Sequence, residues 1–121
     1  MSSDFFLLGS KPTSIGLSAD VAPYIEAHVD PKKSITSKVV LVPLFQISEG
    51  YLKSIKPENF SSCIFIYIKE QGQDLNKWYN LYNHLPPLQI LSPQQITKKL
   101  LENTSLILRE REQKALSLIH I

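Results

Sequence analysis

Two uninterrupted apolar runs in the middle of the chain constrain its fold more than any other feature. Val39–Val42 and Ile64–Ile68 consist of aliphatic and aromatic residues, many of them β-branched, and neither run contains a charged residue. A strand with one face in water alternates polar and apolar residues, whereas a run that is apolar on both faces is typical of a strand inside a parallel sheet. The two runs therefore predict central strands of a sheet that is covered on both faces.

Two shorter apolar segments predict further strands. Phe5–Leu8 ends at the breaker Gly9–Pro12, and Leu88–Leu91 follows a pair of prolines. The strands alternate with amphipathic stretches, and this alternation is typical of an α/β domain built on a parallel sheet. We therefore predict a three-layer α/β fold with a mostly parallel sheet of about four to five strands.

Three of the amphipathic stretches are expected to be short helices. The first starts at Ser18 as its N-cap and ends at Asp30, before a proline. The second covers residues 47–55. In the third, Leu75, Trp78, Tyr79 and Tyr82 recur at spacings of three and four.

The longest helix is expected to begin at Ser92–Pro93, with the serine as N-cap and the proline at the first helical position. A helix from there to His120 is about 40 Å long, which is longer than the strands. We expect its later turns to extend past the sheet and to expose an apolar stripe to a partner protein: Leu100, Ile107, Leu108, Leu118 and Ile119. The alternative is a break near residues 103–105, with the helix folding back onto its own sheet.

The composition excludes several classes of protein. The chain has 121 residues, the size of one domain, so residues 1–121 are expected to form a single domain. A net charge of +2 excludes a histone-like character, and one cysteine excludes an intramolecular disulfide and a cysteine-rich zinc site. No membrane span or signal peptide is expected, and a reducing compartment, the cytosol or the nucleus, is predicted.

The residues of common catalytic sites do not come together in the sequence. The loop after the first apolar segment has a single glycine, Gly9, so it does not match a phosphate-binding loop. Cys63 is expected to be a small buried side chain, and His28, His84 and His120 show no metal-ligand spacing. We expect no catalytic residue, no metal and no cofactor.

Basic residues are dense only in the last helix. They are candidate contacts for nucleic acid, and the alternative is a solvated helix face: Lys98, Lys99, Arg109, Arg111 and Lys114.

The second half of the chain resembles the nuclease-like domain of the XPF family. The resemblance rests on the strand Ser62–Ile68, the helix after it, the strand Leu88–Leu91 and the segment Ser92–Ile96 that opens a long helix. Val39–Leu52 has the shape of the family's signature strand and the helix that follows, so the resemblance covers about residues 38–115.

The resemblance implies an XPF-like nuclease fold without nuclease activity. In active members the signature strand carries Glu-Arg-Lys and an aspartate four residues later, and these positions fall on Pro43, Leu44, Phe45 and Glu49. The metal-binding acid after the first strand would fall near Gly9, where there is none. Without clustered carboxylates a divalent cation has no oxygen ligands.

Catalytically dead members of this family pair with a larger XPF-like subunit. The resemblance therefore implies a non-catalytic, nuclear subunit of a heterodimer that acts at branched DNA in meiotic recombination and crossover formation or in DNA repair. The helix-hairpin-helix module that normally follows the last helix is not expected in this chain. The alternative function is a small α/β adaptor or assembly factor with no role at nucleic acid.

Overall fold

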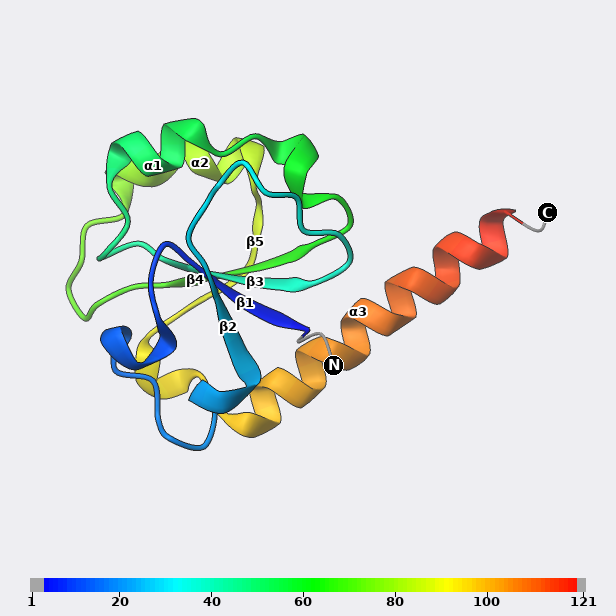
Figure 1. The fold of residues 1–121 in the computed structure, drawn as a ribbon, viewed down its shortest axis with the longest axis horizontal. Coiled ribbons are helices and arrows are strands. Elements are labelled where there is room, and N and C mark those ends of the chain that lie inside the picture. The colour runs from blue at the N-terminus through cyan, green and yellow to red at the C-terminus, as the bar shows by residue number, and fades with distance from the viewer. Residues whose placement is uncertain (1–3, 120–121) are drawn as a thin grey trace.

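The computed structural model of the chain describes residues 4–119, apart from the side chains of residues 52, 79, 81, 82 and 115–119. Its centre is a five-stranded sheet in which every pairing is parallel (Figure 1). The spatial order is β2-β1-β3-β4-β5. The strands are β1 (Phe5–Leu8), β2 (Ile25–His28), β3 (Val39–Pro43), β4 (Ile64–Ile68) and β5 (Pro87–Leu91).

The two central apolar runs form inner strands of the sheet, as predicted, and the structure pairs them with each other. Val39 lies opposite Ile64, and every residue of β3 and β4 is buried. Side chains alternate between two separate cores, so that Val40 packs on one face of the sheet and Leu41 on the other. The three-layer, parallel α/β fold is thereby confirmed.

Helices cover both faces of this sheet. One face carries α1 (Glu49–Ser54), the 3-10 turn Pro57–Phe60 and α2 (Tyr79–His84), which lie together in Figure 1. The other face carries the 3-10 turn Pro12–Ile15 and the first half of α3 (Lys98–Ile119). No helix of the described residues has the length and apolar character of a membrane span.

The helix predicted from Ser18 to Asp30 is wrong. A short 3-10 turn, Ala22–Tyr24, leads directly into the edge strand β2. β2 pairs with β1 in parallel, with Phe5 opposite Ile25, and only Ile25 and His28 of the strand are buried. An edge strand of four residues has too little apolar pattern to be told from a helix by its sequence, and hydrogen bonds to β1 decide its conformation.

The last helix begins later than predicted. Ser92 caps a turn as expected, and the structure adds a capping box with Gln95, but the box starts only a single 3-10 turn, Pro93–Gln95. Ile96 is then extended and 2% exposed, because its side chain packs into the core below the sheet. The N-cap contact of α3 comes from Thr97, whose Oγ1 accepts a hydrogen bond from the backbone N–H of Leu100 at 3.1 Å.

From Lys98 onward α3 is one continuous helix of 22 residues, about 33 Å long. The alternative with a break at residues 103–105 is therefore wrong. Thr104 is buried there without disturbing the helix, since its hydroxyl donates to the carbonyl of Leu100 at 2.7 Å.

Candidate functional site

The carboxyl edge of the sheet is the first place to look for a site. In doubly wound parallel sheets, ligands bind where the connections from two neighbouring strands leave toward opposite faces. Here these strands are β1, which leads to the turn Pro12–Ile15 on one face, and β3, which leads to α1 on the other. Pro43, Leu44 and Phe45 lie at the end of β3, so the resemblance places its catalytic triplet at this edge.

Apolar side chains fill this edge. Leu44 and Ile47 are buried, and both belong to the core on the α1 side. Gly9 ends β1 with φ +79°, and a Cβ at this position would lie 3.6 Å from Ile47 Cγ1 and 3.8 Å from the ring of Tyr51. The place between the ends of β1 and β3 is thus packed with Leu44, Ile47 and Tyr51, none of which has a carboxylate.

Tyr51 of α1 covers Gly9 at the end of β1. Its hydroxyl donates a hydrogen bond to the backbone carbonyl of His28 at 3.1 Å. Burial, with the nearby charge of Asp30, raises the pKa of Tyr51 to about 12, so the hydroxyl stays protonated as a donor. Glu49, at the position that the resemblance assigns to an aspartate, is exposed on the first turn of α1.

His28 and Cys63 are candidates for a reactive side chain, but each is partly or fully buried among packing residues. His28 lies edge-on between Phe6 and Phe60, and its Nε2–H donates to the carbonyl of Lys33 at 3.1 Å. Burial lowers the pKa of His28 and raises that of the Cys63 thiol, so each favours its neutral form. The described residues hold no group of three or more His, Cys, Asp or Glu side chains suited to a metal, and His120 lies outside them.

The predicted partner-binding stripe of α3 divides in the structure. Leu108 is 1% exposed and packs into the core of the domain itself with Leu101, so its expected exposure is wrong. Leu100 and Ile107 are half-buried against the same core. Residues 118 and 119 are helical, and their side chains lie outside the described part of the chain.

Leu106 is an exposed apolar residue of α3 that the sequence pattern missed. It is 63% exposed and stands off the buried line of Leu101, Thr104 and Leu108. The predicted stripe included Ile107 and Leu108 but not Leu106, and only the packing of α3 on the sheet shows which of these neighbouring side chains stays exposed.

A groove of about 360 Å³ runs along this side of α3. Phe5 of β1, Tyr24 before β2, and Leu101 and Leu106 of α3 supply its apolar walls. Tyr24 is 50% exposed, and Lys98 Nζ lies 5.7 Å from the centre of its ring, within cation–π range. Three distant segments build this groove, so no single stretch of sequence indicates it.

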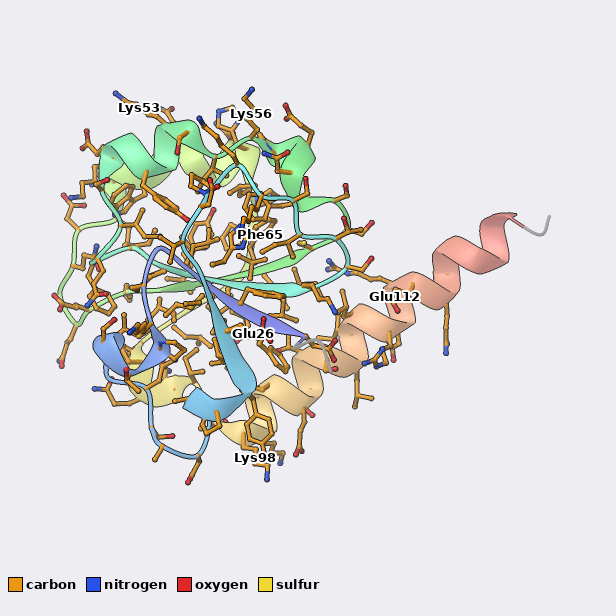
Figure 2. The ribbon with its side chains drawn as sticks, viewed as in Figure 1. Glu26, Lys53, Lys56, Phe65, Lys98 and Glu112 are labelled. Atoms are coloured by element: carbon orange, nitrogen blue, oxygen red, sulfur yellow. The ribbon has the colours of Figure 1, made fainter. Side chains whose placement is uncertain are left out.

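The five basic residues of α3 are exposed but do not form one stripe. At 3.6 residues per turn Lys98 and Arg109 share a side, whereas Lys99 and Lys114 face outward. Figure 2 shows Lys98 near the start of α3 and Glu112 further along the same helix. Arg109 is also engaged, because its Nη2 donates to Asp4 Oδ2 at 2.9 Å.

Comparison of the chain with protein-family models, with curated proteins and with solved structures finds no match.

Proposed function

We propose that this chain is a non-catalytic subunit of an XPF-like heterodimer that supports meiotic recombination or DNA repair at branched DNA. The observation that carries the proposal is the exposed side of α3, where an apolar groove lies beside a helix that continues past the sheet (Figure 1). The larger subunit would dock there, and the complex would work in the nucleus.

The exposed residues of the groove support a protein partner. Tyr24 and Leu106 each leave half or more of their side-chain surface in water, next to the partly buried Phe5. Covering a large apolar side chain contributes roughly 1.5–3 kcal/mol, before the cost of association. Adjacent exposed apolar side chains are typical of interaction surfaces.

The filled carboxyl edge of the sheet supports a role other than hydrolysis. Leu44 is buried where the resemblance expects a metal-site residue, and Tyr51 covers the neighbouring Gly9. A cation bound there would need to displace packed apolar side chains, and the subunit would leave cleavage to its partner.

Any DNA contact would come from exposed basic side chains of α3. Lys99, Arg111 and Lys114 are exposed, and the described part of the chain offers them no ion pair. Three phosphate contacts give a log–log salt slope of roughly −3, which is weak binding for the isolated domain. Substantial affinity would therefore need the assembled heterodimer.

The test is affinity capture from a nuclear extract with the intact chain and with Leu106→Asp. We expect the intact chain to retain a larger protein that carries the Glu-Arg-Lys and aspartate motif, and the variant to lose it at an unchanged melting temperature. Lys114→Gln, an exposed residue further along α3 and turned away from the groove, is the matched control and should retain the partner. A stoichiometric partner without an XPF-like domain, or a complex that binds branched and linear DNA equally, would refute the proposal.

A small α/β adaptor with no nucleic-acid role is the second candidate. The observation in its favour is the pairing of Arg109 with Asp4 and the presence of Glu102, Glu110 and Glu112 among the basic residues. The double variant Lys99→Glu and Lys114→Glu separates the two functions. The adaptor predicts unchanged DNA binding by the assembled complex, whereas the XPF-like subunit predicts a loss of roughly tenfold or more at low salt.

A further inference from the structure

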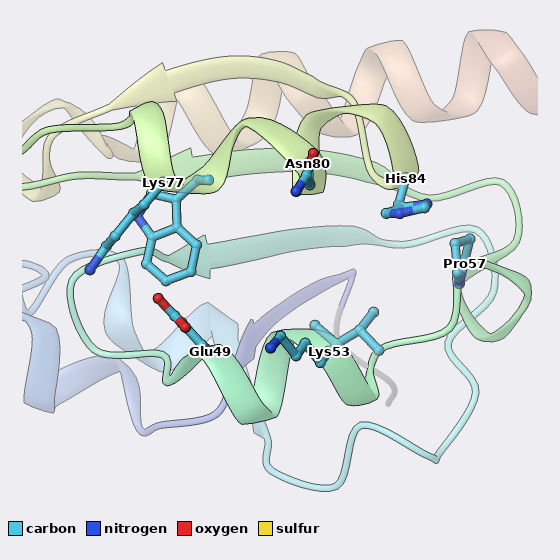
Figure 3. Close-up of a pocket in the computed structure, with 8 residues that line it drawn as sticks. Glu49, Lys53, Pro57, Lys77, Asn80 and His84 are labelled. Carbon is cyan, nitrogen blue, oxygen red and sulfur yellow. The ribbon is translucent and has the colours of Figure 1, made fainter.

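A second cavity lies on the opposite face of the sheet from α3. It has a volume of about 470 Å³ and separates α1 from α2 (Figure 3). This volume falls within the range of about 300–1,000 Å³ that is common for small-molecule sites. The cavity is independent of the α3 surface, so an occupant here would not compete with a partner there.

Trp78 forms the inner wall of this cavity. The side chain is 4% exposed, and its indole nitrogen Nε1 is buried with no hydrogen-bond acceptor among the side chains that the structure describes. Buried N–H groups in folded proteins nearly always have a partner, and leaving one without an acceptor costs about 1–3 kcal/mol. Because Nε1 has almost no accessible surface, an occupant would bring it an acceptor only if the indole shifted toward the cavity.

The rim of the cavity carries more positive than negative charge. Lys53 on α1 and Lys77 before α2 bring two ammonium groups, against the single carboxylate of Glu49. His84 adds ring nitrogens, and Figure 3 shows it toward one end of the space, with Lys77 toward the other. Such a rim favours an anion.

The remaining side chains match a planar, polar-edged molecule. Asn80, drawn on the α2 side in Figure 3, offers both an amide donor and a carbonyl acceptor. Glu49, on the α1 side, can accept hydrogen bonds from hydroxyl groups. Ile55 and Trp78 add an apolar wall, of which 9% and 4% is exposed, and Lys77 Nζ lies 4.8 Å from the centre of the Trp78 ring.

We propose that this α1–α2 cavity binds a nucleoside monophosphate. The phosphate would lie at Lys53 and His84, the ribose hydroxyls near Glu49, and the base against the wall formed by Ile55 and Trp78 with its edge at Asn80. Each kind of lining group then has a counterpart in the ligand: ammonium for phosphate, carboxylate for hydroxyl, amide for base edge and apolar wall for ring face.

The chain provides its own reporter for this site, because Trp78 is its only tryptophan. Intrinsic fluorescence of the full chain is titrated with adenosine 5′-monophosphate, with inorganic phosphate and with adenosine. We expect saturable quenching by the monophosphate at sub-millimolar concentration, and at least about tenfold weaker binding of phosphate alone and of adenosine alone. Calorimetry provides a readout that does not depend on the indole.

Substitutions then locate the binding. Lys53→Gln and His84→Gln change exposed side chains, and each should weaken the monophosphate about tenfold without changing the melting temperature. Lys99→Gln, an exposed lysine on α3, is the matched control and should bind as the parent chain does. The absence of a saturable signal up to ~10 mM would overturn the proposal, as would equal weakening by Lys99→Gln and Lys53→Gln. Equal affinity for adenosine and its monophosphate would overturn the role of the phosphate.

Discussion

Asp4 and Arg109 form an ion pair at 2.9 Å between the residue that precedes β1 and the second half of α3. The other carboxylate oxygen of Asp4 lies 3.5 Å from Lys38 Nζ, just before β3. One carboxylate thus connects two neighbouring strands to the helix, close to the last side chain of α3 known to be buried, Leu108.

Removal of this carboxylate should cost little stability. Asp4→Asn is expected to lower the free energy of unfolding by less than ~1 kcal/mol, because both partners are partly exposed to solvent. Urea unfolding at low salt and at ~1 M salt checks this, since the difference from the parent chain should shrink when the pair is screened. A loss that stays the same at both salt concentrations would assign the role of Asp4 to hydrogen bonding instead of charge.

Truncation of Leu108 should lower the free energy of unfolding strongly, whereas truncation of Leu106 should change it little. Leu108→Ala leaves a cavity in the core below the sheet and should destabilise the domain by about 2–5 kcal/mol. Leu106→Ala changes a side chain that is 63% exposed and should stay within about 0.5 kcal/mol of the parent. Chemical denaturation of the two variants side by side is the measurement, and similar losses would contradict the placement of α3.

Stability should fall in mild acid because of His28. Burial lowers its pKa below the usual 6.5, so below that pH the unfolded chain binds a proton that the folded chain still excludes. The free energy of unfolding therefore decreases as the pH drops from 6.5 toward the folded pKa, and it is fully recovered above 6.5.

Melting temperatures between pH 7.5 and pH 5 measure this effect against a His28→Gln variant, in which that slope should be reduced. An identical pH dependence in the variant would assign the titration to another group.

Gly9→Ala should lower the free energy of unfolding because of the backbone conformation at this position. The φ of +79° at Gly9 is a left-handed conformation that costs an L-residue roughly 1–2 kcal/mol, whereas the new Cβ would meet Ile47 at an ordinary contact distance of 3.6 Å. Gly72 has a similar φ of +78° with no atom within 4 Å, so Gly72→Ala isolates the conformational cost. Equal losses in the two variants are expected, and a much larger loss at Gly9 would show a steric cost at Tyr51 and Ile47.

Much of the fold could be predicted because its central elements carry strong local signals. Val39–Val42 and Ile64–Ile68 are apolar on both faces, and the structure places them side by side with all residues of both strands buried. β2 was missed because Ile25–His28 has four residues and a mixed pattern, and its hydrogen bonds go to β1, about twenty positions earlier in the chain.

The candidate surface was only partly predictable. The exposed basic residues of α3 could be read from the sequence, but their interruption by the Asp4 pair could not, because Asp4 and Arg109 are 105 positions apart. The apolar groove joins Phe5, Tyr24 and Leu106 from three separate segments. Its members are individually ordinary apolar residues, and only their juxtaposition makes a surface.

Local patterning by itself determined the parallel α/β architecture, the cap at Ser92 and the presence of a long last helix. Tertiary structure decided where that helix starts and which of its faces is buried. Because Ile96 is extended and packs into the core, α3 begins only at Lys98. In this position of the helix Leu108 is buried and Leu106 is exposed to water. The reason is geometric. Apolar residues in the sequence show that one face of the helix is buried, but the rotation of the helix on the sheet decides which of these residues lie on that face.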